Sequence, residues 1–153
     1  MLLRPYRTGD GRRVVQLIGE TIDACYRGIY PPEVIAYFHT HHGLRRVAKR
    51  ARMGHSVVVE AGPELVATGS LEGEYIGGVF VRPDGQRRGV GRAVMAALEE
   101  QARATGVREV WLNVSLPARG FYEALGYGDF TDAVEYVGPR VPLVFWKAKK
   151  RLA

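Results

Sequence analysis

The chain has 153 residues, of which 46% are hydrophobic, so residues 1–153 are predicted to form a single domain with a sizeable core. Lys and Arg number 22 against 16 Asp and Glu, and the resulting net charge of +6 suits an acidic ligand or nucleic acid. The amino terminus lacks a sustained apolar segment, and no apolar run approaches the roughly 18 residues that span a bilayer. We therefore expect no membrane partner and a cytoplasmic location.

Cysteine and histidine offer little for metal chemistry. The single Cys25 rules out an intramolecular disulfide or a multi-cysteine metal site, and its register with Ile18 and Ile22 predicts a core position rather than a catalytic thiol. The histidines within residues 39–43 have no carboxylate at a useful spacing and no HExxH-like register. We predict an exposed turn at a helix end there, and no metal.

The excess positive charge lies in two clusters, within residues 45–52 and 147–151. Neither cluster is interleaved with the aromatic side chains of a platform for single-stranded nucleic acid. A basic nucleic-acid-binding protein that uses residues 45–52 is therefore an alternative that the pattern disfavours.

The amino-terminal third reads as one short strand followed by helices. The strand begins at Leu2 and Leu3, and apolar residues at helical spacing predict a helix over residues 11–26. Pro31-Pro32-Glu33 is typical of a helix start. It opens a broken helical region that runs through Phe38 and again over residues 44–52.

The central segment predicts strands over residues 56–61, 65–71 and 75–82. Their connections are too short for a parallel crossover, so they are expected to form an antiparallel meander. A helix over residues 89–104 then supplies a crossover to a strand over residues 107–114, which should lie parallel to the strand that begins at Tyr75.

The carboxy-terminal segment begins with a short helix that Pro117 opens and Gly126 ends, and Phe121 is expected to be a core residue. An antiparallel pair is predicted at residues 133–137 and 141–148. The last basic residues read as a loose tail.

The loop between the strand that begins at Tyr75 and the next helix has the features of an anion site. The first N–H groups of a helix have no internal partner and lie at the positive end of its dipole. Gly89 and Gly91 lack a Cβ, so a phosphate could approach these groups closely. A P-loop is excluded because Arg92-Ala93 replaces its Lys-Ser/Thr, and a dinucleotide fingerprint is excluded because Val94 takes the place of its third small residue.

The same loop carries the arrangement Val-x-Pro-x-x-Gln-x-x-Gly-x-Gly, from Val81 to Gly91, which resembles the acyl-CoA-binding motif of the GCN5-related N-acetyltransferase (GNAT) family. A second block from Trp111 to Tyr127 is similar to the strand, helix and Phe-Tyr-x-x-x-Gly-Tyr element of that family. The two blocks cover about residues 75–127. The resemblance implies an α/β fold with a mixed, splayed sheet, an antiparallel amino-terminal meander and flanking helices.

The resemblance also implies a set of acetyl-CoA contacts. The strand backbone would pair with the pantetheine arm, and the N–H groups of the loop would hold the pyrophosphate; these positions are Val79, Phe80, Val81, Arg87, Arg88, Gly89, Val90, Gly91 and Arg92.

For catalysis, Tyr122 matches the family's tyrosine near the CoA sulfur, where a phenol can protonate the departing thiolate. Asn113 could orient the acceptor or a water molecule. The family's usual glutamate position falls at Tyr75, so Glu74 is the expected base, with Glu72 as an alternative. The chain departs from the family again at Leu116-Pro117, where many members carry an asparagine.

Together these features predict an enzyme that transfers acetyl from acetyl-CoA to a primary amine by direct attack in a ternary complex. The region from Tyr26 to Phe38 and the hairpin from Glu72 to Tyr75 would shape the acceptor site for a small molecule or a peptide amine. A non-catalytic acyl-CoA-binding regulatory module is the alternative, and a homodimer is left open.

Overall fold

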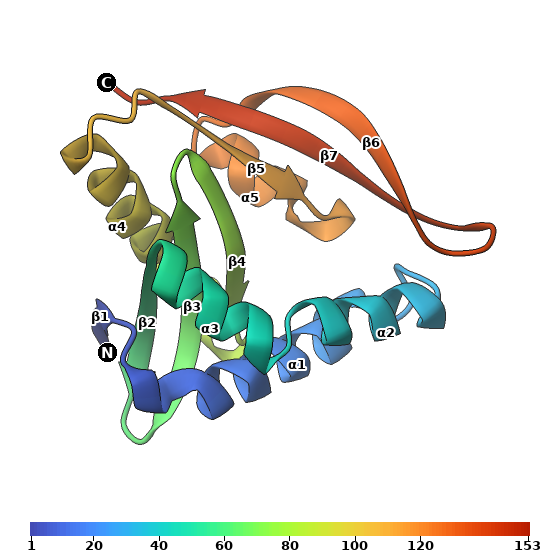
Figure 1. The fold of residues 1–153 in the computed structure, drawn as a ribbon, viewed down its shortest axis with the longest axis horizontal. Coiled ribbons are helices and arrows are strands. Elements are labelled where there is room, and N and C mark those ends of the chain that lie inside the picture. Colours follow the sequence, from blue (N-terminus) through green and yellow to red (C-terminus); the bar gives the residue numbers. More distant parts are fainter.

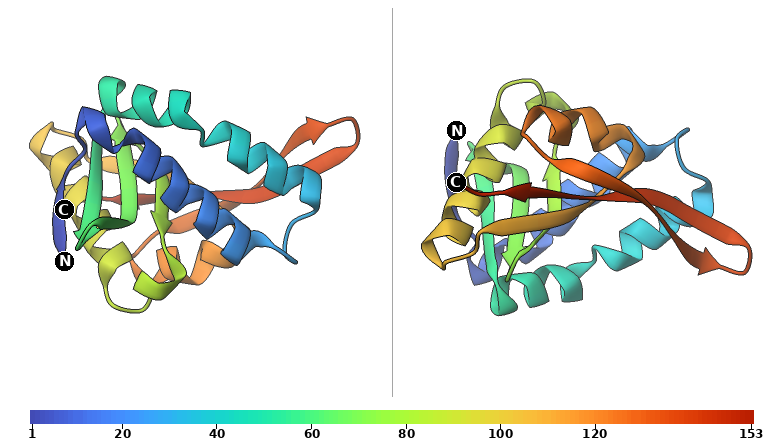
Figure 2. Two further views of the ribbon diagram at one scale, coloured as in Figure 1. Left: turned by 90° about the horizontal axis from the view of Figure 1, so that it is seen from below. Right: turned by 90° about the horizontal axis from the view of Figure 1, so that it is seen from above.

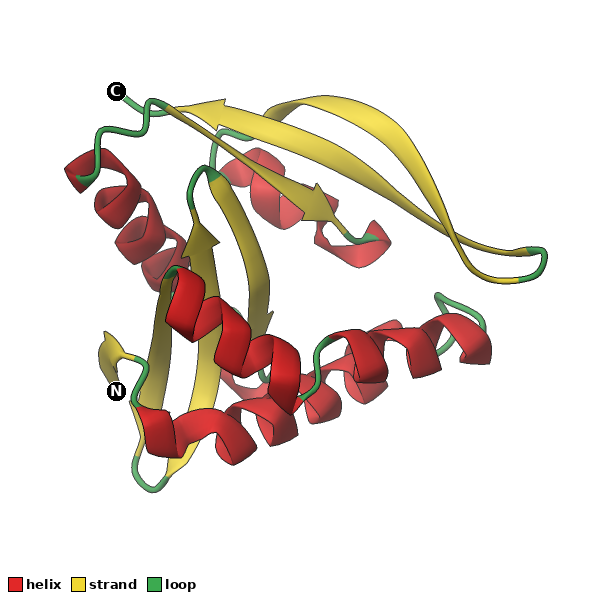
Figure 3. Ribbon diagram, in the orientation of Figure 1, coloured by secondary structure: helices red, strands yellow, loops and turns green.

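The computed structural model describes residues 1–153 as a seven-stranded mixed sheet with helices on both faces (Figure 1, Figure 3). The strand order is β1-β2-β3-β4-β5-β7-β6. The strands are β1 (Leu2–Pro5), β2 (His55–Ala61), β3 (Glu64–Glu72), β4 (Tyr75–Val81), β5 (Glu109–Val114), β6 (Gly128–Gly138) and β7 (Val141–Arg151). The helices are α1 (Gly11–Tyr26), α2 (Pro32–His41), α3 (Leu44–Met53), α4 (Val90–Ala104) and α5 (Arg119–Ala124), with short 3-10 turns η1 (Thr8–Asp10), η2 (Pro83–Gly85) and η3 (Leu116–Ala118).

The elements predicted around the central meander are confirmed. Strands β2, β3 and β4 pair antiparallel in sequence order, and β4 pairs parallel with β5 after the α4 crossover. Helix α1 has the bounds expected from its apolar spacing. The turns are too short for any other pairing, and the crossover helix is long enough for the parallel one.

Two layers of helix enclose the amino-terminal half of the sheet. In Figure 2, α1, α2 and α3 lie on one side, and α4 and α5 lie on the other. The side chains of β2 alternate between these layers, since Val57 and Val59 join the core around α4 while Val58 joins the core around α1. Gly69 of β3 lets α4 approach closely, because a Cβ there would lie 2.7 Å from the Val94 side chain.

The sheet splays between β4 and β5. The two strands share a single pair, Tyr75 with Trp111, and the N–H of Trp111 donates to the Glu74 carbonyl at 3.0 Å. Beyond this point β5, β7 and β6 diverge from β4, as Figure 1 shows. The inner edge of β4 therefore has no neighbouring strand along most of its length.

The carboxy terminus differs from the predicted loose tail. Strand β7 continues through Arg151, and its second half pairs with the whole of β5, from Val114 opposite Trp146 to Glu109 opposite Arg151. Leu152 is buried in the main core. The end of this strand was not evident from the sequence, because exposed lysine and arginine residues alternate with the inward-facing side chains and interrupt the apolar pattern.

Three smaller expectations were also wrong. Cys25 is half-buried at the end of α1 rather than a core residue, because this end of the helix lines a pocket at the splay. Phe121 is 37% exposed. Helix α2 continues through His41, and the turn that follows it at His42 and Gly43 is half-buried instead of exposed. Tertiary packing at the splay accounts for all three positions.

Candidate active site

A single large pocket, about 1010 Å³ in volume, follows the splay between the two halves of the sheet. It is lined from one side by α1, α2 and β4 and from the other by β5, α5 and the β6–β7 hairpin. The pocket also reaches the loop before α4. It thus joins segments that are far apart in the sequence.

At one end of the pocket, the loop before α4 presents backbone N–H groups. Gly89 caps the helix in the left-handed conformation (φ 77°), and nothing lies within 4 Å of a Cβ built on it. The N–H of Ala93 is the first to bond to this turn, at 3.0 Å from the Gly89 carbonyl. The N–H groups of Val90, Gly91 and Arg92 come before it and have no intrahelical partner.

The predicted loop residues do not all meet the pocket in the same way. Arg87, Gly89, Gly91 and Arg92 line it, whereas the side chain of Arg88 is exposed outside it and that of Val90 is buried in the core. The missing side chain of Gly91 makes room for another residue, since a Cβ there would lie 3.1 Å from the Phe121 ring.

Along the middle of the pocket, β4 offers a free backbone edge with a bulge. Ser70 of β3 pairs with Gly77 and Thr68 pairs with Phe80, so the β4 strand has one extra residue in this interval. Gly78 has φ +61°, which an L side chain adopts only with strain. Val79 and Val81 line the pocket, and the Phe80 side chain packs mostly against the α1 side.

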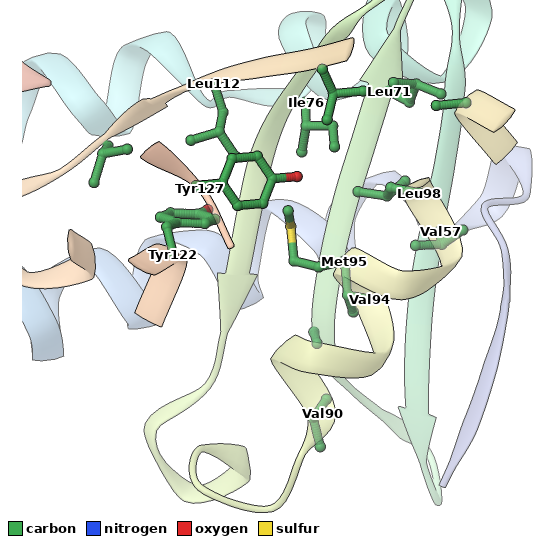
Figure 4. Packing of buried hydrophobic residues seen from close by; sticks show 14 of the residues in the cluster. Val57, Leu71, Ile76, Val90, Val94, Met95, Leu98, Leu112, Tyr122 and Tyr127 are labelled. Atoms are coloured by element: carbon green, nitrogen blue, oxygen red, sulfur yellow. The ribbon is translucent and has the colours of Figure 1, made fainter. Parts of the chain in front are cut away.

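Tyr122 lies where the pocket meets the core. Its side chain is 7% exposed, and its ring packs edge-on against Tyr127 at 5.7 Å between centroids. Figure 4 shows both rings beside Met95 of α4. Burial raises the pKa of Tyr122, so its phenol stays protonated throughout the physiological range.

Strand β5 supplies the facing wall. Its alternation directs Trp111 and Asn113 toward the pocket, whereas Leu112 is buried. The ring of Trp111 packs on that of Tyr75 at 4.5 Å between centroids. Burial raises the pKa of Tyr75, and a hydrogen bond with Asn113 partly opposes this shift.

The two glutamates of the β3–β4 hairpin differ in position. Glu72 ends β3 and lines the pocket. Glu74 is exposed at the turn and does not line it. Glu72 therefore shares the lining of the pocket with Tyr122 and Asn113, whereas Glu74 lies outside it.

The other end of the pocket is aromatic and comes mainly from α1 and α2. Tyr26, Tyr30 and Phe38 form a cluster whose ring centroids lie 5.0 to 5.4 Å apart. The Tyr30 hydroxyl accepts a hydrogen bond from the Leu116 N–H at 2.8 Å. This contact joins the α1–α2 loop to η3 across the splay, where the chain departs from the family pattern.

Several pocket residues went unpredicted. His42 and Arg46 come from the α2–α3 region, and Glu135, Leu143 and Phe145 come from the β6–β7 hairpin. The cluster of basic residues in α3 gave no signal for Arg46, because only the fold distinguishes it from its exposed neighbours. No group of three or more His, Cys, Asp and Glu side chains could hold a metal ion.

Comparison with known proteins agrees with this architecture. The acetyltransferase (GNAT) family matches residues 16–127, which is more than half of the chain. No curated protein matches in sequence. The chain therefore belongs to the GNAT acetyltransferase family. Separately, no helix of the structure is long and apolar enough to cross a membrane.

Solved structures show the same fold at low sequence identity. A GCN5-related N-acetyltransferase from Rhodopseudomonas palustris is 23% identical with a TM-score of 0.89, and the match covers 99% of this chain and 95% of that one. The PaiA N-acetyltransferase from Thermoplasma acidophilum, solved in complex with coenzyme A, is 14% identical with a TM-score of 0.74, covering 99% and 100%. A ribosomal-protein-alanine N-acetyltransferase from Brucella melitensis is 17% identical with a TM-score of 0.72, covering 99% and 100%.

Proposed function

We propose that the protein transfers the acetyl group of acetyl-CoA to a primary amine by direct attack in a ternary complex. One observation carries the proposal: a continuous pocket runs from the free N–H groups before α4, along the unpaired edge of β4, to Tyr122. An anion, an extended amide-containing arm and a thioester need these three surfaces in this order. The coenzyme A bound to the PaiA relative supports this choice of acyl donor.

In this proposal the loop and β4 bind the donor. The N–H groups from Arg87 to Arg92 hold the pyrophosphate at the positive end of the α4 dipole. The backbone of β4 from Val79 to Val81 pairs with the pantetheine amides as an added strand would. The splay supplies the space, because β5 leaves the β4 edge after one residue pair.

The chemical step follows from the groups around the thioester. A neutral amine attacks the carbonyl carbon, so a C–N bond forms while the C–S bond breaks and the thiolate departs. Tyr122 donates its proton to that thiolate, since its phenol is neutral before the reaction. Glu72 takes the proton that the amine loses, directly or through water, because it lines the pocket and Glu74 does not. Asn113 orients the acceptor from β5.

The proposal is tested first at Gly89. Replacing Gly89 with Leu should weaken acetyl-CoA binding by at least about 100-fold, since the side chain would occupy the approach to the N–H groups and strain a residue with φ +77°. Calorimetric titration with acetyl-CoA measures the affinity. Gly106→Leu is the matched control, because Gly106 (φ +84°) also has nothing within 4 Å but lies beyond the other end of α4.

Thiol release from acetyl-CoA across a broad panel of amines tests the reaction. We expect turnover with at least one class of primary amine. Unchanged affinity in Gly89→Leu would overturn the donor site, and CoA binding without turnover of any amine would favour the regulatory module. The cytoplasmic location, the single domain and a homodimer stay predictions.

A further inference from the structure

Helix α3 brings two arginines to the acceptor side of the pocket. Arg46 and Arg50 are four residues apart and so lie on the same helix face. Arg46 lines the pocket, and Arg50 is buried behind it with 4% exposure. The remaining basic residues Arg45, Lys49 and Arg52 are exposed. Nothing in the sequence distinguishes these five basic residues from one another, and only the fold places Arg46 and Arg50 on the inward face of the helix.

Neither inward-facing arginine has an anionic partner. None of the ion pairs includes Arg46 or Arg50, although any carboxylate oxygen within 4.0 Å would count. The Nε atoms of both side chains are buried without a hydrogen-bond partner. Burial, with Arg46 nearby, lowers the pKa of Arg50 to about 10, so the Arg50 guanidinium stays charged at neutral pH. Burying unpaired charges in this way is unfavourable unless a ligand neutralises them.

His42 adds a third donor to this site. Nη2 of Arg50 lies 2.7 Å from Nδ1 of His42, and a guanidinium can only donate, so Nδ1 accepts. Burial and the charge of Arg50 hold the pKa of His42 well below its usual value, so the ring is neutral. A neutral ring that accepts at Nδ1 carries its proton at Nε2. His42 lines the pocket, so this Nε2–H is a hydrogen-bond donor available to a ligand there.

This donor cluster adjoins the proposed reaction centre. The Arg50 guanidinium packs against the β4 bulge, because Nη1 would lie 2.7 Å from a Cβ on Gly78. Tyr75 interacts electrostatically with both regions. The charges of Arg50 and Arg46 lower the pKa of Tyr75, and Tyr75 in turn raises the pKa of Tyr122. Glu72 also acts on Arg50 without pairing with it.

We infer that the acceptor is a primary amine that carries an anionic group, a carboxylate or a phosphate, and that Arg46 and His42 bind this group while the amine faces Glu72. This inference rests on the proposed function and narrows its acceptor. Arg50 acts as a positioning residue, since it holds the His42 ring and adds positive potential from behind. A zwitterionic acceptor would place its negative end at the guanidinium and its amine near a carboxylate.

The aromatic wall alone would also suit a cationic acceptor. Tyr37 and Trp111 line the pocket, and aromatic rings attract ammonium groups. Two unpaired guanidinium groups repel a polycation in the same pocket, and Glu135, which accepts a hydrogen bond from Tyr37 at 3.5 Å, offsets only part of that charge. The charge distribution therefore favours an anionic amine over a polyamine or an aminoglycoside.

The test compares acceptors that differ only in the anionic group. Thiol release is measured with phenylalanine against phenylalanine amide, with phosphoethanolamine against ethanolamine, and with spermidine and kanamycin as polycations. We expect at least one anionic amine to exceed its neutral partner by about 10-fold or more in kcat/KM, since hydrogen bonds to charged groups carry that much discrimination. The two pairs distinguish a carboxylate from a phosphate.

Arg46→Gln should abolish this preference and lower kcat/KM for the anionic amine by about 10- to 100-fold, with little change for the neutral one. Arg52→Gln removes the same charge from an exposed position on the same helix and should leave both values within about twofold. A preference for neutral or polycationic amines, or equal effects of the two variants, would overturn the inference.

A binding measurement separates this inference from the proposed reaction. Calorimetry on the CoA-saturated protein compares N-acetylphenylalanine and N-acetylphenylalanine amide, and O-phosphoethanolamine with ethanolamine, on wild type and Arg46→Gln. If no amine is turned over, the proposed reaction fails. The anion site would still be supported if the wild type binds either anionic compound more tightly than its neutral partner and Arg46→Gln abolishes that difference. Equal binding of acid and neutral forms would overturn it.

Discussion

Tyr122 combines two properties that the proposed reaction needs. It lines the pocket, and burial raises its pKa, so the phenol is held neutral beside the position assigned to the thioester sulfur. A buried hydroxyl next to a developing thiolate stabilises that charge more strongly than water would. A tyrosine buried in the core away from the pocket would pack equally well, but it could not donate a proton to the thiolate.

Tyr122→Phe should lower kcat by about 100-fold or more while acetyl-CoA affinity stays unchanged, because the variant removes the proton donor and keeps the ring. Stopped-flow or steady-state thiol release measures kcat, and calorimetry measures the affinity. The matched control is Tyr127→Phe. The Tyr127 hydroxyl donates a hydrogen bond of 2.8 Å to Glu99, and this contact lies outside the pocket. The variant should therefore lower the stability of the protein but leave kcat unchanged. Equal rates for wild type and Tyr122→Phe would contradict the acid role.

At the scale of elements, the junction between β1 and α1 depends on a buried carboxylate. Asp10 accepts two hydrogen bonds from the Arg4 guanidinium, at 2.8 and 2.9 Å, and further ones from the Arg7 N–H and from Arg13. Its side chain is 3% exposed. The Arg4 hydrogen bonds hold the pKa of Asp10 at about 2, below the ordinary 3.8. This network fixes the start of α1 against the edge of the sheet.

Asp10→Asn should lower the free energy of unfolding by about 2 kcal/mol at neutral pH, since a depressed carboxyl pKa corresponds to a more stable charged form in the folded protein. The contribution is fully present above pH 3.8 and is lost as the pH falls through about 2. Urea unfolding of wild type and variant from pH 7 to pH 2 measures the difference, which should shrink over that window. Asp23→Asn, at an exposed pair with His39, is the control. A difference that does not change with pH would contradict the ionic origin.

The β4 bulge shows what the sequence says about an element and what it omits. Gly77-Gly78 lies within the apolar run that predicted a strand, yet Gly78 adopts φ +61° and leaves space for the Arg50 guanidinium. The conformation depends on pairing with β3, and the space depends on α3. Neither partner is adjacent in the sequence, so the local pattern could not report either contact.

On the scale of the whole molecule, the two halves of the sheet meet at one end and diverge at the other. The closed end is joined by Glu99 of α4, which pairs with Lys150 of β7 at 2.8 Å and accepts the Tyr127 hydroxyl at 2.8 Å. The Glu99 side chain is 7% exposed. The open end holds the pocket. The Glu99–Lys150 pair thus joins α4 to β7 at the closed end.

Lys150→Met should lower the free energy of unfolding by about 2 to 3 kcal/mol, because it leaves the buried Glu99 carboxylate with only the more distant Arg103, at 4.0 Å, as a cation. Thermal and urea unfolding measure the loss. Lys149→Met is the matched control, since Lys149 lies 3.9 Å from the exposed Asp129 and such surface pairs contribute little. Similar losses in both variants would contradict a structural role for the Glu99–Lys150 pair.

Local patterns were enough to predict most elements and part of the candidate site. Helical spacing predicted α1 with its bounds, short turns predicted the meander, and Gly89 predicted an open helix start that the structure confirms. These features depend on neighbours within a few residues, so the sequence contains them directly. The β7 extension through Arg151 escaped prediction because its pairing partner, β5, lies about 40 residues earlier.

By itself the sequence determined most helices and strands, the strand order of the meander and the loop before α4, because each is encoded by local spacing. The fold class followed from the resemblance of two motif blocks to the GNAT family. Only the tertiary structure decided which of several equivalent side chains reach the pocket: Glu72 rather than Glu74, and Arg46 and Arg50 rather than Arg45 and Arg52. The physical reason is that the orientation of a side chain toward a pocket between β4 and β5 depends on how distant elements pack, and burial at that pocket sets its charge and pKa.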